Sequence, residues 1–339
     1  MRLLATIAFI VMSVAAVANE AMPSIKHLVD IGGGRHLNIV CVGNGSPTVV
    51  FLQGSGASII DWRKVRSPVA AFTRECFYDR ANLGYSDPSD NPTTAENVVE
   101  DLHALMQTAK IKRPVVLVGH SLGGLYATLF ADKYLSDVAG LVLVDPVFAG
   151  QFDVAINRQD SAALLAEDEQ WAESMRSCQK LAQAGKLKGE NRHICNMPAR
   201  DDLRGYDLSP QEIEYVDTQL SQPPYYTNQL SEYENMAAKG GRAVAAESLD
   251  GAQEREHERS FGSIPLIVLT AGEMFNNPKV SEATNAAVRE NWKSGHDKLA
   301  KRSTRGESIV VANSHHTIQL DQPDGVVEAI RKVVMQARQ

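Results

Sequence analysis

Along this chain, apolar residues recur with two different periods, and the alternation between the two periods predicts the elements. Short apolar runs predict strands at 48–52, 75–79, 115–119, 138–144, 264–270 and 308–311. Apolar positions at helical spacing predict helices at 61–72, 94–109, 125–130, 281–302 and 323–336. Residues 26–31 and 35–41 predict a hairpin around Gly32–Gly34. This order predicts an α/β fold, with a mostly parallel sheet covered by helices on both faces.

The alternation of strands and helices breaks at Pro146. From about 147 to 261 the chain is richer in Gln, Glu, Asp, Lys and Ala, and its apolar periodicity is helical. Ser209 and Glu212 form a capping box around Pro210, which predicts a helix start there. We therefore expect a core built from 24–147 and 262–339, with residues 148–261 inserted as a helical lid or cap.

The first residues have the pattern of a secretory signal. Arg2 precedes the apolar stretch Leu3–Val14, and Ala16–Ala18 supplies a small-residue cleavage site. The apolar stretch is short for a bilayer span, and no cysteine follows it closely. We expect a signal peptide at 1–18, cleavage after Ala18, and a periplasmic or secreted protein with no stable membrane anchor. A retained N-terminal anchor is the alternative.

Charge and cysteine content narrow the class of partner. Without Arg2 the mature chain has 33 basic and 41 acidic residues, a net charge of −8, and the acids are dispersed. The chain has no basic stripe, so nucleic acid is not an expected partner. The cysteine spacings do not resemble a paired metal-ligand set, and we expect no metal and no cofactor. Export permits disulfides, and four cysteines allow three pairings.

The most informative motif is Gly-His-Ser-Leu-Gly at 119–123. It follows the predicted strand at 115–119 and leads into the predicted helix. Gly119 and Gly123 let the two arms of a sharp turn pass closely, and the turn exposes the hydroxyl of Ser121 at the end of the strand. This arrangement predicts a nucleophile elbow with Ser121 as the nucleophile. A structural serine in a tight turn is the alternative.

A serine nucleophile needs a base and an orienting carboxylate. His315 and His316 both follow the predicted strand at 308–311, and the segment 318–323 leads from them into the last helix. The elbow, together with the segments 78–87, 143–146 and 314–323, resembles the α/β-hydrolase superfamily. The similarity is to its esterase-like members with a lid inserted after the sixth strand, and it covers 25–147 and 262–339.

The resemblance implies roles for the remaining site residues. In such proteins the last motif reads Ser-Gly-His, so His316 takes the position of the base and His315 stands where glycine is usual. The usual position of the acid after the seventh strand holds Phe275. We expect Asp145, at the end of the sixth strand, to be the acid, with Glu273 as the alternative. His315 as the base, or both histidines as surface residues, also stay open.

The resemblance also implies the oxyanion hole and the disulfides. Two backbone N–H groups would hold the oxyanion, that of Leu122 and that of Ser55, in a loop where Gln53 replaces the usual histidine. The second and fourth strands are neighbours in this superfamily, which implies the pair Cys41–Cys76. The remaining pair, Cys178–Cys195, would lie within the lid.

These observations predict an exported serine hydrolase that acts on a small-molecule acyl substrate. The resemblance, rather than any single residue, implies a carboxylic ester as that substrate. An aminopeptidase or a thioesterase on the same triad is one alternative, and a non-catalytic binding protein with the same fold is another. We also expect Asp79 and Arg80 to form an ion pair near the rim of the site, and His120 to serve in packing and hydrogen bonding. The oligomeric state stays open.

Overall fold

The computed structural model describes residues 25–187, 195, 208–237, 247–273 and 275–339. The predicted signal peptide and its cleavage site lie outside these ranges. Within the described ranges, no helix combines the length and the apolar character that a bilayer crossing requires.

Eight strands form one sheet in the order β1-β2-β4-β3-β5-β6-β7-β8. The strands are β1 (Leu28–Asp30), β2 (His36–Val42), β3 (Val49–Leu52), β4 (Glu75–Tyr78), β5 (Val115–His120), β6 (Val138–Val144), β7 (Leu266–Ala271) and β8 (Gly306–Val311). β2 pairs antiparallel with both β1 and β4, and all pairings from β4 to β8 are parallel. The α/β fold with a mostly parallel sheet is therefore confirmed.

Helices cover both faces of this sheet, which explains its continuous apolar strands. The core helices are α1 (Arg63–Ala70), α2 (Ala95–Thr108), α3 (Leu122–Lys133), α9 (Glu282–Ala300), α10 (Ile318–Asp321) and α11 (Pro323–Ala337). Leu117 and Leu143 pack with α2 and α3, whereas Val116 and Val142 pack on the other face with α1 and α11. Successive residues of a strand point to opposite faces, so a strand that is buried on both faces is apolar at most consecutive positions.

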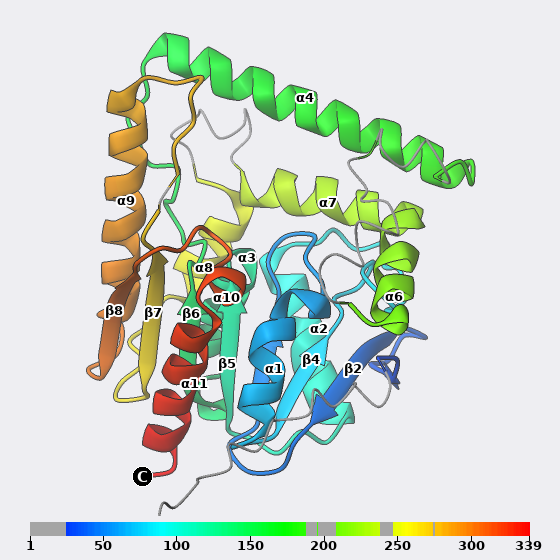
Figure 1. Cartoon of the computed structure of the whole chain (residues 1–339), viewed down its shortest axis with the longest axis vertical. Coiled ribbons are helices and arrows are strands. Elements are labelled where there is room, and N and C mark those ends of the chain that lie inside the picture. The colour runs from blue at the N-terminus through cyan, green and yellow to red at the C-terminus, as the bar shows by residue number, and fades with distance from the viewer. Residues whose placement is uncertain (1–24, 188–194, 196–207, 238–246, 274) are drawn as a thin grey trace, which may run out of the picture.

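Four further helices lie between β6 and β7 in the described part of the chain. They are α4 (Arg158–Gln183), α6 (Pro210–Ser221), α7 (Pro223–Met236) and α8 (Leu249–His257), and we call them the inserted helices. In Figure 1, α4 runs across the top of the molecule and α7 lies between α4 and the sheet. The capping box predicted at Ser209 and Glu212 begins α6. These helices lie within the segment expected to form the lid.

The structure contains two disulfides. Cys41 and Cys76 face each other in register on β2 and β4, with their Cα atoms 4.1 Å apart. Cys178 of α4 pairs with Cys195, at a Cα–Cα distance of 5.7 Å. These are the two pairings that the resemblance implied.

Glu75, the first residue of β4, is an isolated carboxyl group in the interior. Its side chain is buried, and neither carboxyl oxygen has a hydrogen-bond partner among the described residues. Burial raises its pKa from the ordinary value of 4.5 to about 9, although the charge of Arg66 opposes the shift. The folded protein therefore keeps this carboxyl group protonated at neutral pH.

Replacing Glu75 with glutamine is expected to flatten the pH dependence of stability. Between pH 4.5 and about 9 the folded state holds a proton that the unfolded chain has released, so the free energy of unfolding falls as the pH rises. A single group contributes about 1.4 kcal/mol per pH unit to this slope. Urea unfolding of wild type and Glu75→Gln at several pH values between 5 and 8.5 measures the difference between the two slopes.

The control for this prediction is Glu328→Gln. Glu328 lies on α11 with 74% of its side chain exposed, so its replacement should leave the slope unchanged. Equal slopes in wild type and Glu75→Gln would show that Glu75 is already ionised in the folded protein.

Candidate active site

Ser121 lies at a strained turn between β5 and α3. Its backbone has φ 53° and ψ −124°, a region that non-glycine residues seldom adopt. The Ser121 N–H donates to the carbonyl of Val144 (3.1 Å), and the Ser121 carbonyl accepts from the N–H groups of Gly124 (2.8 Å) and Val147 (2.9 Å). The surrounding backbone therefore holds the strained turn in place.

The two glycines of the elbow motif are required by close packing. A Cβ atom on Gly119 would lie 2.3 Å from the carbonyl oxygen of Gly123, and one on Gly123 would lie 2.3 Å from that of Leu52. Neither position has room for a side chain, so both positions of the motif require glycine.

Asp145 and His316 meet at the carboxyl end of the sheet. Oδ2 of Asp145, directly after β6, lies 2.6 Å from Nδ1 of His316. The other oxygen, Oδ1, accepts hydrogen bonds from the N–H of Ala271 and from Nε1 of Trp292, each at 3.0 Å. The side chain of Asp145 is buried, whereas the imidazole of His316 is 49% exposed. A neighbouring carboxylate fixes the Nδ1–H tautomer and leaves Nε2 free to accept a proton.

The hydrogen bonds at Asp145 outweigh its burial. Burial alone would raise the pKa of this carboxyl group, but the hydrogen bonds from His316, Trp292 and Ala271 and the charge of His316 hold its pKa below the ordinary value. Asp145 is therefore ionised at neutral pH, as an orienting carboxylate must be.

Glu273, the alternative acid, lies beside the other histidine. Its carboxylate is 60% exposed and lies 3.6 Å from Nε2 of His315. Nδ1 of His315 contacts Asp321 at 3.2 Å. The structure therefore brings Asp145 to His316 and Glu273 to His315, and this geometry favours Asp145 as the acid.

The loop after β3 passes directly beside Ser121. A Cβ atom on Gly54 would lie 3.1 Å from the Cβ of Ser121. Ser55 follows Gly54 and is exposed, and Leu122 supplies the first N–H of α3. Within the described part of the chain, neither the Ser55 N–H nor the Leu122 N–H has a hydrogen-bond acceptor. Gln53 donates to the carbonyl of Tyr78 (2.9 Å) and so supports the loop from inside.

The expected ion pair between Asp79 and Arg80 is wrong. Nη2 of Arg80 contacts the carboxylate of Glu232 at 2.6 Å, and Glu232 lies on α7. Asp79 instead accepts a hydrogen bond from the hydroxyl of Tyr215 on α6, at 2.5 Å. Sequence reasoning missed Glu232, because nothing in the sequence links two residues 152 positions apart.

Two histidines support the site without reaching its centre. His120 donates from Nε2 to the carbonyl of His316 (2.9 Å), and burial lowers the pKa of His120 to about 3, so this ring is neutral. This agrees with the packing and hydrogen-bonding role expected for it. His296 bridges Thr270 (2.7 Å) and the carbonyl of Pro146 (2.9 Å), which holds the turn that follows Asp145. His296 and Trp292 lie on α9 and had no signal in the sequence.

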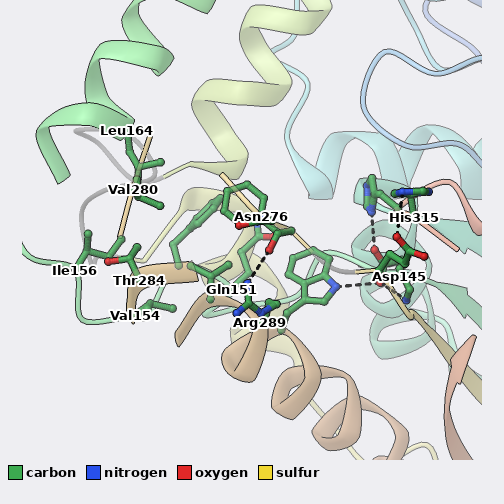
Figure 2. A pocket seen from close by; sticks show the side chains of 17 residues that line it. Asp145, Gln151, Val154, Ile156, Leu164, Asn276, Val280, Thr284, Arg289 and His315 are labelled. Atoms are coloured by element: carbon green, nitrogen blue, oxygen red, sulfur yellow. Dashed lines mark hydrogen bonds and ion pairs between the residues drawn. The ribbon is translucent and has the colours of Figure 1, made fainter. Parts of the chain in front are cut away.

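Two of the cavities lined by described residues lie at the site. One, of about 640 Å³, is lined by His316 and Asp145. Figure 2 shows that it extends away from Asp145 along α9. Its far end is lined by Val154, Ile156, Leu164, Val280 and Val288. The second, of about 840 Å³, lies between α4 and α7 and reaches Ser55; its aromatic lining is Trp171, Tyr225, Tyr226 and Tyr233.

Comparisons with known proteins agree with this architecture. The family model described as "Alpha/beta hydrolase family" matches residues 49–329, so the chain belongs to the alpha/beta hydrolase family. An uncharacterized protein of Bacillus subtilis, YqjL, is 24% identical over 291 residues, 86% of this chain and 85% of YqjL.

Solved structures show the same fold at low sequence identity. A thermophilic esterase from Thermogutta terrifontis is 17% identical with a TM-score of 0.56, over 93% of this chain and all of the esterase. An enol-lactonase from Burkholderia xenovorans is 18% identical with a TM-score of 0.56, over 91% of this chain and 99% of the lactonase. At these identities the likeness concerns the fold alone.

Proposed function

We propose that this protein is an exported serine hydrolase that cleaves carboxylic esters through an acyl-enzyme. The observation that carries the proposal is the 2.6 Å contact between His316 and the buried Asp145, at the same sheet edge as the strained Ser121. This combination supplies an oriented base for a serine at an elbow, which is the requirement for nucleophilic catalysis by a hydroxyl group.

In the proposed mechanism, Oγ of Ser121 attacks the acyl carbonyl while Nε2 of His316 takes the hydroxyl proton. Asp145 keeps the imidazole oriented and stabilises its charged form. The N–H groups of Ser55 and Leu122 hold the negative oxygen of the tetrahedral intermediate. As this intermediate collapses, His316 returns the proton to the leaving alcohol. Water then attacks the acyl-enzyme with His316 as its base, and this step releases the acid and restores Ser121.

The two cavities support a substrate with a group on each side of the reacting carbonyl. The cavity along α9 has an apolar far end, whereas the cavity that reaches Ser55 combines aromatic side chains with polar ones such as Glu167, Gln170 and Lys279. One cavity reaches the proposed base and the other reaches the proposed oxyanion donor Ser55. The acyl part and the alcohol part of an ester can therefore bind in separate cavities. We propose that residues 148–261, which include the inserted helices, form a lid or cap over the site. We also propose that the substrate is a small molecule.

An aminopeptidase activity has less support. It would need a free carboxylate beside the site to bind the substrate amine. Two buried carboxylates of the inserted helices, Glu212 and Glu232, are already paired with Arg66 and Arg80. The exposed Glu273, which lines the cavity beside His316, lies 3.6 Å from Nε2 of His315. Export is proposed from the N-terminal pattern, and the two disulfides are compatible with it.

Pre-steady-state kinetics with p-nitrophenyl esters of increasing acyl length tests the proposal. We expect a burst of one p-nitrophenolate per active site followed by slower turnover, because acylation and deacylation are separate steps. Amino-acid p-nitroanilides and acyl thioesters are measured in parallel. Turnover of either without ester turnover would replace the ester assignment, and a folded protein that turns over none of them would favour the binding-protein alternative.

A further inference from the structure

The ion pair between Arg80 and Glu232 joins the core to an inserted helix at full burial. Arg80 follows β4 and is 2% exposed at its side chain, and Glu232 on α7 is 0% exposed. Nε and Nη2 of Arg80 lie 3.1 and 2.6 Å from Oε1 of Glu232. A buried pair of this kind persists only when its remaining donors and acceptors are also satisfied, so the other contacts of the pair show what it holds.

Among the described residues, the other side-chain hydrogen bonds of this pair go to the loop beside Ser121. Nη1 of Arg80 donates to the carbonyl of Gln53 (2.6 Å), and Nη2 donates to the carbonyl of Gly54 (2.7 Å). Oε2 of Glu232 accepts from the hydroxyl of Ser55 (2.8 Å) and from the N–H of Gly56 (3.0 Å). The ion pair therefore holds the loop on both sides of Ser55.

Because the peptide bond is planar, these contacts also fix the direction of the Ser55 N–H. The carbonyl of Gly54 and the N–H of Ser55 belong to one planar trans peptide group, so the two point in opposite directions. When Arg80 fixes the direction of the Gly54 carbonyl, it also fixes the direction of the Ser55 N–H. Glu232 in the same way fixes the next peptide group, through the N–H of Gly56.

The loop also packs directly against α7. Gly56 has φ +59°, and a Cβ atom there would lie 1.9 Å from Nε2 of Gln229 on that helix. The direction of the Ser55 N–H thus depends on the docking of α7 as well as on the loop itself.

We propose that Arg80 and Glu232 are positioning residues for the oxyanion hole, so that the Ser55 N–H is correctly directed only while α7 is docked on the core. This inference rests on the proposed hydrolase function. The pair does not touch the substrate; it acts through the backbone of Gly54, Ser55 and Gly56.

The chain offers a matched control. Arg66 of α1 and Glu212 of α6 form a second buried ion pair between the core and an inserted helix, at 2.5 Å and with 10% and 8% of their side chains exposed. This pair makes none of the contacts with the loop at 53–57 that Arg80 and Glu232 make. Glu212→Gln therefore weakens the docking of an inserted helix and leaves the hydrogen bonds of Arg80 and Glu232 to the loop in place. The contact of α6 with the loop, a 3.4 Å hydrogen bond from Gln219 to the carbonyl of Gly56, does not involve Glu212.

The test compares Glu232→Gln with Glu212→Gln and Arg80→Lys. For Glu232→Gln we expect kcat to fall about 10- to 100-fold with little change in KM, because a misdirected oxyanion donor acts mainly on the transition state. Arg80→Lys keeps a cation opposite Glu232 but cannot hold both carbonyls, so its kcat should also fall with little change in KM. This variant replaces Glu232→Gln in the test if Glu232→Gln fails to fold. Glu212→Gln should lower thermal stability while kcat stays within about twofold of wild type.

Hydrogen exchange of a peptide covering 53–57 supplies a readout independent of activity. We expect faster exchange in Glu232→Gln than in wild type, and no change in Glu212→Gln. An equal loss of kcat in Glu212→Gln and Glu232→Gln, or unchanged exchange at 53–57, would overturn the inference. If wild type shows no ester turnover, the proposed function fails, and the exchange data still decide whether the pair holds the loop.

Discussion

Replacing Ser121 with alanine is expected to abolish labelling by a fluorophosphonate probe and to lower ester turnover about 10⁴- to 10⁶-fold. The probe forms a covalent bond only with a serine oxygen whose hydroxyl proton is taken by a base. Alanine has no hydroxyl group and cannot react. The strained backbone at φ 53° is as demanding for alanine as for serine, so the change removes the nucleophile with little effect on the fold. Gel-based labelling and p-nitrophenyl ester kinetics measure the two losses.

Ser260→Ala is the control for this experiment. Ser260 lies after α8, and its hydroxyl group makes exposed contacts: it donates to the carbonyl of Arg302 (3.3 Å) and accepts from the N–H of Gly262 (3.1 Å). Its replacement should leave both labelling and turnover unchanged. Labelling that persists in Ser121→Ala would mean that another serine carries the reactivity, and the proposed mechanism would be wrong.

The second large loss of activity is expected from a change at Asp145, the proposed acid. Asp145→Asn should lower kcat about 10⁴-fold. The amide can present its NH₂ group to Nδ1 of His316, which then favours the tautomer with its proton on Nε2, and that nitrogen can no longer accept the proton of Ser121. The side chain keeps its size, and its oxygen can still accept hydrogen bonds from Trp292 and Ala271.

Glu273→Gln is the matched variant for the alternative acid. Glu273 is largely exposed and lies beside His315, so we expect its replacement to change kcat by less than about threefold. Steady-state kinetics of the two variants, with circular dichroism as a check on folding, separates the candidates. A large loss in Glu273→Gln together with a small one in Asp145→Asn would assign the acid to Glu273.

The elbow was predictable from the sequence because its pattern is local. A strand, a turn and a helix follow one another within 115–133, and the close contacts that require Gly119 and Gly123 arise within this turn and with the neighbouring β3. The mostly parallel sheet was predictable for a related reason. A strand that is covered on both faces must be apolar at consecutive positions, and this pattern is visible without any knowledge of the partners.

The acid could not be decided in the same way. Asp145 and Glu273 both follow strands that end at the same edge of the sheet, so both carboxylates have access to the region of the histidine loop. The choice depends on where the loop after β8 places His315 and His316, and on the donors Trp292 and Ala271 around Asp145. These are contacts between segments more than 100 positions apart, and sequence spacing carries no information on them.

The incorrect pairing of Asp79 with Arg80 has an equally simple cause. Asp79 and Arg80 directly follow β4, and each side chain is buried against a different inserted helix. Asp79 meets α6 and Arg80 meets α7, each through a residue of the inserted helices.

The sequence by itself determined the α/β class, the elbow with Ser121 and the two histidines after the last strand, because local periodicity and short motifs encode them. Only the tertiary structure decided which carboxylate reaches His316, and that Glu232 of α7 holds the loop of Ser55. The physical reason is that a charged side chain is buried only where distant groups satisfy it, and the folded chain alone brings those groups together.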